Sequence, residues 1–226
     1  MIHYHGTPIT PRSQLERMAG RHFCVSFAES RDLATCLRIG QSVMLDNGAF
    51  STFTRGAEFD EAGFYAWAES ALAHPHWAVV PDVIDGTVEQ QRELASRWPF
   101  PREFGAPVWH LGLPVDYLLE LVDSWPRVCL GSSGQFWQVG SARWTARMTE
   151  AMNELARRRR FMPNLHGLRM LGVAASWPLG SADSTNVAQN FKLAPRGCAE
   201  CKAAEVDATQ SLSRWVVRDV QQELCL

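Results

Sequence analysis

The sequence contains few charges of either sign and no long apolar run. Charged residues make up 20% of the 226 positions, and the formal net charge is -2 at pH 7. Such a chain has no general excess of basic residues, so any contact with a nucleic acid would need a local cluster of cations. No segment approaches the roughly 18 apolar residues of a membrane-spanning helix. Because 46% of the residues are hydrophobic, we expect a globular protein with a sizeable core.

Targeting and cofactor signatures are also missing. Residues 1–11, MIHYHGTPITP, show no basic region followed by an apolar run, so no signal peptide is expected. The glycine-rich GxGxxG and P-loop motifs do not occur. The six cysteines are scattered along the chain, and Cys24 and Cys129 lie inside apolar, strand-like runs that favour buried thiols. These features predict a reduced, cytoplasmic protein that uses no cofactor.

Short strand-like runs alternate with helical patterns along the whole sequence. The expected strands cover residues 2–5, 22–27, 43–46, 77–82, 107–111, 127–131, 166–171 and 181–184. The expected helices cover residues 11–20, 30–39, 60–73, 87–98, 114–124, 141–160 and 203–224. No linker, repeat or low-complexity segment divides residues 1–226, so we predict a single compact domain with a helical C-terminal segment.

Eight strands separated by helices predict an α/β fold of the (β/α)₈ TIM-barrel type. Strands that alternate with helices form parallel βαβ units, and the chain length lies in the usual range for such barrels. The main alternative is a doubly wound open sheet. The absence of GxGxxG and P-loop motifs gives that alternative no support.

Polar residues occur where several of the predicted strands end. The apolar run 43–45 ends at Asp46, directly before an Asn-Gly turn, and the run WAVVPD ends at Asp82. Another strand ends near His110, and the last predicted strand contains Asp183. A turn carboxylate such as Asp46 could simply cap its turn. Since barrel enzymes carry their chemistry at the carboxyl ends of the strands, however, we expect these four side chains at one mouth.

With these residues in view, the chain resembles the tRNA-guanine transglycosylase superfamily over residues 43–190. It is most similar to the small phage-type members, which exchange guanine in DNA for 7-deazaguanine bases. The resemblance rests on DNGAFS at residues 46–51, VVPD at 79–82, LGSSG at 130–134, GLRMLG at 167–172 and SADSTN at 181–186. It implies a transferase that acts on DNA in the cytoplasm of a phage-infected bacterial cell.

The resemblance also implies roles for individual residues. Asp183 would be the nucleophile that forms a covalent bond with the sugar, and Asp46 would be the general acid or base. The remaining contacts to the guanine or 7-deazaguanine (preQ0-like) base would come from Asp82, His110, Gly131, Ser132, Phe50 and Met170. In this set His110 stands where the family has a glutamine, and Phe50 and Met170 would sandwich the base.

The C-terminal part departs from the tRNA enzymes. Their zinc site of three cysteines and a histidine is reduced to Cys198 and Cys201, so we predict no metal site. The chain is also shorter than the tRNA enzymes, which favours DNA as the substrate. Phosphate contacts are expected from Lys192 and Arg196, with help from the basic run 157–160 unless that run is simply a solvated helix end.

Three other functions remain open at this point. The first is a tRNA-guanine transglycosylase. The second is a non-catalytic barrel subunit that binds a purine or a nucleic acid, and the third is an N-glycosidase that transfers the sugar to water. A homodimer is left open as the assembly, and no membrane partner is expected.

Overall fold

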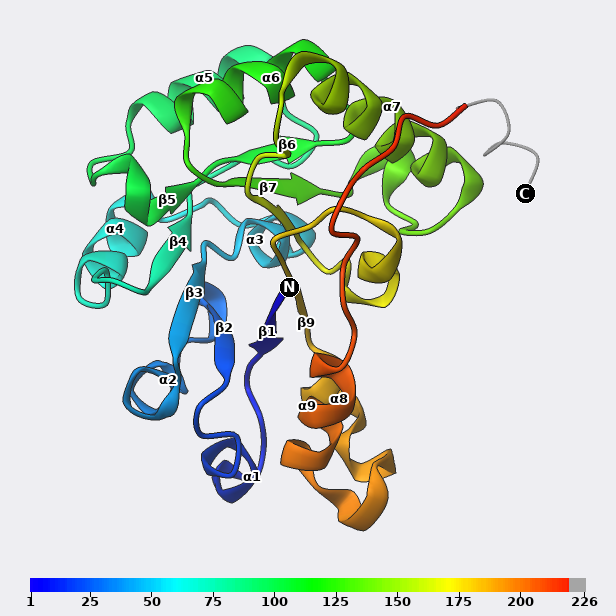
Figure 1. Ribbon diagram of the computed structural model, residues 1–226. Helices are drawn as coiled ribbons and strands as arrows, with labels where there is room; N and C mark the ends of the chain where they lie inside the picture. Colours follow the sequence, from blue (N-terminus) through cyan, green and yellow to red (C-terminus); the bar gives the residue numbers. More distant parts are fainter. Residues whose placement is uncertain (220–226) are drawn as a thin grey trace.

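The structure, a computed structural model, describes residues 1–219 and is built around one sheet of parallel strands (Figure 1). The described strands follow the order β5-β4-β3-β2-β1-β9-β8-β7-β6, and every pair is parallel. Their bounds are β1 Ile2–Gly6, β2 His22–Ser26, β3 Ser42–Asp46, β4 Trp77–Val79, β5 Gly105–Ala106, β6 Val108–His110, β7 Val128–Gly131, β8 Leu165–Gly167 and β9 Ser181–Ser184.

The two ends of this sheet meet at a single proline. β5 pairs with β4, β6 pairs with β7, and only Pro107 separates β5 from β6. Proline has no N–H to donate to a neighbouring strand, but the carbonyl of Pro107 still accepts from Cys129 N at 2.9 Å. The sheet therefore curls into a nearly closed barrel, which is compatible with the TIM type.

Most of the helices lie on the outer side of the barrel, whereas α3 lies at its mouth (Figure 1). The α-helices are α1 Arg12–Glu16, α2 Leu33–Ile39, α3 Ala49–Arg55, α4 Glu61–Glu69, α5 Val88–Ser96, α6 Val115–Ser124, α7 Ala142–Arg158, α8 Asn186–Asn190 and α9 Ala199–Asp207. Short 3₁₀ turns are η1 Phe27–Glu29, η2 Arg102–Phe104, η3 Gly134–Phe136, η4 Leu171–Ser176, η5 Phe191–Leu193 and η6 Pro195–Gly197. Two helices follow β3, and only η4 connects β8 to β9, so strands and helices do not alternate strictly.

Side chains on the two faces of the strands form two apolar layers. The outer layer joins the strands to the helices and contains Phe23, Val25, Val43 and Leu45. The inner layer fills the barrel with Tyr4, Cys24, Met44, Trp77, Val79, Ala106, Val108 and Cys129. This division follows from the strand repeat, in which successive side chains point to opposite faces.

Aromatic and polar side chains fill the barrel interior near the amino ends of the strands. The Tyr4 hydroxyl accepts from Trp77 Nε1 at 2.8 Å and from Ser42 Oγ at 3.1 Å. The His166 ring lies 5.1 Å from the Trp77 ring and 5.8 Å from the Tyr4 ring. Ser42 and Trp77 begin their strands, so this cluster occupies the amino end of the barrel.

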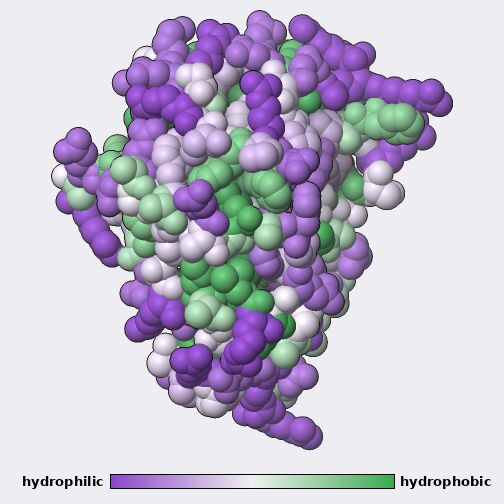
Figure 2. All heavy atoms as spheres, turned by 90° about the vertical axis from the view of Figure 1, so that its left-hand side faces the viewer, coloured by the Kyte–Doolittle hydropathy of each residue, from purple (hydrophilic) through white to green (hydrophobic). Residues whose placement is uncertain are grey.

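The surface on the side of α2 and α4 divides into polar and apolar regions. On the side that carries α2 and α4, hydrophilic side chains cover the top and the bottom, and apolar side chains gather in a central band (Figure 2). Among residues 1–219, no helix is both long enough and apolar enough to cross a membrane.

The predicted C-terminal helix over 203–224 is wrong beyond Asp207. α9 ends there, and residues 208–219 continue without regular helix, while 220–224 lie outside the described residues. Tertiary contacts hold this segment: Trp215 stacks on Trp177 at 5.3 Å, and Asn153 Oδ1 accepts from Trp215 Nε1 and from Arg218 N at 3.0 and 2.9 Å. A side-chain amide on α7 thus replaces the hydrogen bonds that a helix would have made.

The expected strands 77–82 and 166–171 are also longer than the strands found, which end at Val79 and Gly167. The remaining residues of both runs form the loops at the mouth of the barrel. Helix α3, directly after the Asn-Gly turn, was not predicted.

Candidate active site

A cavity of about 300 Å³ opens at the carboxyl ends of the strands. Its size is at the lower end of the range of small-molecule sites. The cavity brings together most of the side chains that the sequence singles out, namely Asp46, Phe50, Asp82, His110, Gly131, Ser132 and Asp183.

The three carboxylates reach the cavity from separate parts of the barrel. Asp46 is the last residue of β3, Asp82 follows β4, and Asp183 lies in β9. Since alternate residues of a strand share a face, Asp46 lies on the same inward face as Met44. β9 is paired to β1 in the sheet, with Asp183 opposite Tyr4, and this pairing brings its carboxylate to the same interior.

Asp46 has the most perturbed acidity of the three. Burial raises the pKa of Asp46 to about 6, and the charges of Asp183 and Asp82 act in the same direction. The Ser26 hydroxyl and the Gly48 backbone N–H oppose this rise in pKa, without cancelling it. Gly48 has a φ of 75°, a left-handed conformation that suits glycine. Asp46 can therefore gain and lose a proton close to neutral pH.

We expect Asp46→Asn to raise the free energy of unfolding at pH 8 by about 1–3 kcal/mol, allowing for partial exposure of the side chain. The folded-state pKa lies above the unfolded one, so the contribution of Asp46 to stability is complete at low pH and is lost as pH rises through about 6. An asparagine at position 46 carries no charge at any pH, so the variant avoids this loss of stability. Urea unfolding of both proteins at several pH values measures the difference, which should shrink as pH falls from 6 toward 4. An equal gain from the exposed Asp116→Asn would contradict this explanation.

The Asp183 carboxylate is held by the loop after β8. Its Oδ1 accepts from Arg169 N at 2.8 Å and lies 3.2 Å from His166 Nε2. The other ring nitrogen of His166, Nδ1, lies 2.8 Å from Ser181 Oγ. If the Ser181 hydroxyl donates to Nδ1, then Nε2–H donates to Asp183, and both ring nitrogens are satisfied. Oδ2 makes no hydrogen bond to the described part of the chain and is available to the cavity.

His166 was missed by the sequence analysis as a site residue. Its signal was present, however, because a histidine in an apolar strand needs partners for both ring nitrogens. Here those partners are Ser181 and Asp183, on the neighbouring strand β9.

Arg169 changes the direction of the chain at the cavity. Its φ is 58°, which is uncommon for a residue other than glycine. This conformation accompanies the Asp183 hydrogen bond, and the guanidinium lies 4.1 Å from the centre of the Phe50 ring. Leu168 and Arg169 both line the cavity.

Met170, by contrast, is fully buried against the outer apolar layer and does not line the cavity. The position of Met170 thus gives no support to its expected role in sandwiching a base, which stays a prediction.

Asp82 and His110, which were expected to contact the base separately, are paired with each other. Asp82 Oδ2 lies 2.8 Å from His110 Nε2, and both side chains are less than 10% exposed. Asp82 Oδ1 accepts from Asn47 Nδ2 at 2.7 Å, and His110 Nδ1 lies 3.4 Å from Ser133 Oγ. A Cβ on Gly131 would come within 2.9 Å of His110 Nδ1. Gly131 thus leaves room for the imidazole, and Asn47 orients the carboxylate.

The predicted phosphate contacts lie elsewhere. Lys192 and Arg196 are exposed in η5 and η6 and do not line the cavity. Their part in binding DNA stays a prediction. Two arginines that the sequence analysis did not select, Arg55 and Arg169, do line the cavity.

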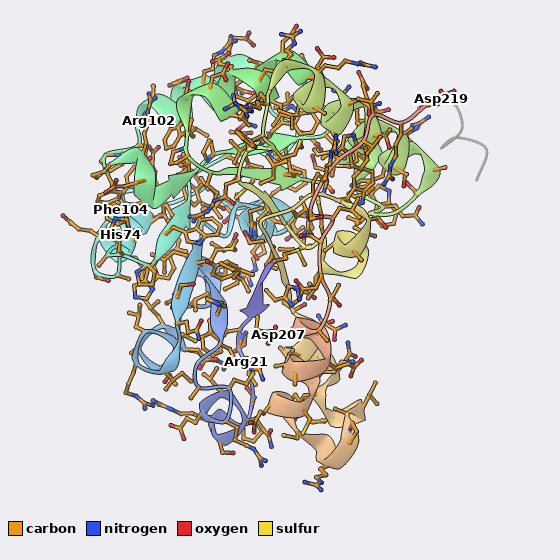
Figure 3. All side chains as sticks on the ribbon, in the orientation of Figure 1. Arg21, His74, Arg102, Phe104, Asp207 and Asp219 are labelled. Carbon is orange, nitrogen blue, oxygen red and sulfur yellow. The ribbon has the colours of Figure 1, made fainter. Side chains whose placement is uncertain are left out.

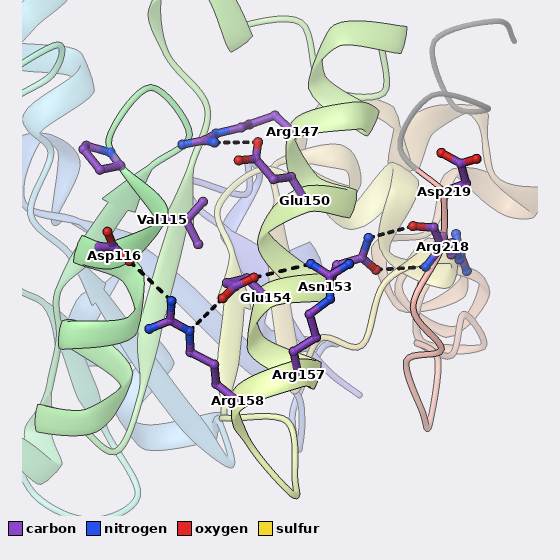
Figure 4. A pocket seen from close by; sticks show the side chains of 11 residues that line it. Val115, Asp116, Arg147, Glu150, Asn153, Glu154, Arg157, Arg158, Arg218 and Asp219 are labelled. Carbon is purple, nitrogen blue, oxygen red and sulfur yellow. Dashed lines mark hydrogen bonds and ion pairs between the residues drawn. The ribbon is translucent and has the colours of Figure 1, made fainter.

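A larger hollow of about 690 Å³ lies between α6, α7 and residues 218–219, outside the barrel (Figure 4). Its charges are mostly paired with one another: Arg158 contacts Glu154 at 2.7 Å and Asp116 at 3.8 Å, and Arg147 contacts Glu150 at 2.6 Å. Arg157 also pairs with Glu154. The basic run 157–160 is thus partly engaged in surface ion pairs, and this hollow does not share the convergent carboxylates of the barrel mouth.

Metal ligands do not converge in the described chain. Over residues 1–219, no group of three or more histidine, cysteine, aspartate or glutamate side chains could hold a metal ion. Cys198 and Cys201 lie together at the start of α9 without further ligands of these types.

Comparisons with protein-family models, with curated proteins and with solved structures find no match to this chain. The chemistry of the cavity must therefore be argued from its own residues. It combines a carboxyl group that exchanges protons near neutral pH, a second carboxylate with an oxygen left available, and a rigid Asp-His pair. Such a set can protonate a leaving group and attack an electrophilic carbon in one small cavity.

Proposed function

We propose that the chain is a guanine transglycosylase, built on a variant (β/α)₈ barrel, that exchanges guanine in DNA for a 7-deazaguanine base. One observation carries the proposal: Asp46, with a pKa of about 6, shares a base-sized cavity with Asp183. Glycosyl transfer with retention uses a pair of carboxyl groups in this way, one as acid and one as nucleophile. The motif resemblance supports the same chemistry, and no cofactor is needed.

In the first step, Asp183 Oδ2 attacks C1′ of the target nucleotide as the C1′–N9 bond breaks. The bonding electrons leave with the guanine, and Asp46 donates a proton to that base. The hydrogen bonds from Arg169 N and His166 to Oδ1 hold the carboxylate in position, so that attack takes place from the other oxygen. The product is a covalent sugar ester of Asp183.

In the second step, Asp46 removes the N9 proton of the incoming 7-deazaguanine. Its N9 then attacks C1′, and the ester bond to Asp183 breaks with release of the carboxylate. Because one group must first donate and then accept the proton, a pKa near the working pH suits both halves of the exchange.

The Asp82-His110 pair supports recognition of the base. A carboxylate oxygen can accept more than one hydrogen bond, so Asp82 can receive guanine N1–H and N2–H while Asn47 and His110 hold it in place. Backbone groups near Gly131 and Ser132 can contact O6. The Phe50 ring, with Arg169 above it, offers a flat surface on which the base can stack.

Aromatic and basic side chains around the mouth support a nucleic-acid substrate. Phe50 and Phe53 on α3 are 46% and 54% exposed, and Trp137 after β7 is 72% exposed. Arg55 and Arg169 supply positive charge at the cavity. Exposed rings that stack on unpaired bases and arginines that contact phosphates are typical of single-strand recognition. A nucleotide must leave the helical stack to enter a cavity of this kind.

The double variant Arg55→Gln, Arg169→Asn is expected to weaken DNA binding and to lower the salt slope by about two, one for each lost phosphate contact. Asparagine tolerates the left-handed backbone of residue 169. Fluorescence anisotropy at several salt concentrations measures the slope. The matched variant Lys192→Gln, Arg196→Asn tests the other candidate pair in the same way, since residue 196 also has a left-handed backbone, with a φ of 65°. Unchanged binding in the first variant would contradict the assignment of these arginines.

The decisive test of function is exchange with defined substrates. Purified protein is incubated with labelled guanine and either DNA or tRNA, and nucleosides from DNA of cells that express the chain are analysed by mass spectrometry. We expect label in DNA, and a 7-deazaguanine nucleoside where the modified base is supplied. Efficient exchange into tRNA with DNA ignored would favour the tRNA enzyme, and binding of guanine without exchange would favour a non-catalytic subunit.

One observation favours a second candidate, the N-glycosidase. The buried Asp82-His110 pair, with Ser133 beside the second ring nitrogen, could hold and deprotonate a water molecule. In that case the sugar would be transferred to water, and free guanine would be released with no uptake of label. The ratio of guanine release to label uptake distinguishes the two activities.

A further inference from the structure

Two cysteines meet at the start of α9, away from the cavity. Cys198 is the N-cap residue, and its Sγ accepts a hydrogen bond from Cys201 N at 3.5 Å. Cys198 is 2% exposed, while Cys201, in the first turn of the helix, is partly exposed. An N-cap side chain folds over the first turn, so both sulfur atoms lie at the same end of the helix.

The two thiols differ from each other in acidity. A hydrogen bond from the Cys201 side chain lowers the pKa of Cys198, and the charge of Arg17 acts in the same direction. The same thiol-thiol bond raises the pKa of Cys201. Cys198 is thus the more acidic thiol of the pair, a pattern known from other Cys-x-x-Cys arrangements.

The other cysteines of the described chain have no such arrangement. Cys24 and Cys129 fill the barrel interior, and burial raises the pKa of both thiols well above its usual range. Cys36 is a fully buried residue of α2, and burial raises the pKa of its thiol to about 12. Structural thiols of this kind are chemically inert, so reactivity within residues 1–219 is concentrated at the α9 pair.

We propose that Cys198 and Cys201 are a reversible dithiol-disulfide site that reacts with low-molecular-weight disulfides. Residues one helical turn apart fall within the Cα separation that a disulfide requires. The pair lies outside the cavity residues, so the proposal does not depend on the transglycosylase function.

Solvent access decides which thiol reacts first, because Cys198 is the more acidic thiol but is almost fully buried. Cys201, the more exposed thiol, loses its proton and attacks one sulfur of the small disulfide, whose S–S bond breaks to release one thiol. The Cys198 thiolate then attacks Cys201 Sγ, forms the Cys198-Cys201 bond and releases the second thiol. Two protein thiols are oxidised, and one small disulfide is reduced to two thiols.

The test uses glutathione disulfide and the full chain carrying Cys225→Ser, because residue 225 lies outside the described residues. Protein is treated under native conditions, quenched with acid, alkylated after unfolding and mapped by mass spectrometry. We expect the loss of two alkylation sites and a protein mass two hydrogen atoms below that of the reduced protein. We also expect one peptide in which Cys198 and Cys201 are joined by an internal disulfide. Dithiothreitol should restore both sites.

Single variants separate the two roles. Cys198→Ser retains a good N-cap and should trap glutathione on Cys201 as a stable mixed disulfide. Cys201→Ser should take up little glutathione, since Cys198 is almost fully buried. Cys36→Ser should behave like the parent protein, and circular dichroism checks that each variant is folded.

Three outcomes would overturn the proposal. The first is full alkylation of Cys198 and Cys201 after treatment with glutathione disulfide. The second is a cross-link to another cysteine. The third is tightly bound zinc in the purified protein that protects the pair from oxidation. The guanine-exchange assay plays no part in this test, so failure here leaves the proposed function untouched.

Discussion

Replacing Asp183 with asparagine is expected to abolish the covalent DNA adduct and to slow base exchange by about 10⁴-fold or more. The amide retains the shape of the carboxyl group and can still accept from Arg169 N. It lacks the negative charge that, in the proposed mechanism, attacks C1′ and stabilises the developing positive charge on the sugar. Denaturing electrophoresis of protein mixed with labelled DNA measures the adduct, and uptake of labelled guanine measures exchange.

The control for this variant is Asp116→Asn, an exposed carboxylate outside the barrel that should leave both assays unchanged. Thermal unfolding checks that Asp183→Asn is folded, since Asp183 also contacts His166. Near-normal exchange in a folded Asp183→Asn protein would show that the nucleophile is another residue.

Replacing Asp46 with asparagine is expected to slow adduct formation by about 10²–10⁴-fold, the usual contribution of a general acid. In the proposed mechanism, cleavage needs the protonated form of Asp46, whose pKa is about 6. In the unmodified protein, the rate of adduct formation should therefore fall about tenfold per pH unit well above pH 6. Asparagine does not titrate, so the rate in the variant should lose this dependence.

Single-turnover mixing of excess protein with labelled DNA, from below pH 6 to well above it, measures this rate directly. Substrate binding is measured at each pH by anisotropy, so that weaker binding is not mistaken for slower chemistry. If the rate of adduct formation fell with pH in the same way in both proteins, the titrating group would be a residue other than Asp46.

The docking of α9 shows how distant residues decide local structure. Asp207, at the end of the helix, accepts from His3 Nδ1 at 3.1 Å and from His5 Nε2 at 3.0 Å, and it also pairs with Arg21 (Figure 3). These partners and their hydrogen bonds lower the pKa of Asp207 against the opposing effect of burial. About 200 positions separate Asp207 from its histidine partners in the sequence, so no local pattern could have indicated the contact.

Much of the barrel was predictable because its signals are local. Apolar runs bounded by turn residues predicted the parallel strands, and the helix starts at Thr87 and Ser141 match capping patterns that the structure contains. The additional strand β5, which lies before Pro107 and was not expected, and the end of α9 at Asp207 depended on neighbours instead. Asn153 and Trp177 hold residues 208–219 in an extended path, and neither lies close to that segment in the sequence.

The sequence by itself determined which acids lie in or directly after the expected strands, because the apolar runs and the turn residues that bound them are local patterns. Asp46, Asp82 and Asp183 were predictable for that reason. Only the tertiary structure decided what each carboxylate contacts: Asp82 is bound to His110, and Asp183 is held by Arg169 N. It also decided the raised pKa of Asp46, since desolvation and the field of neighbouring charges depend on distances in space and not on positions along the chain.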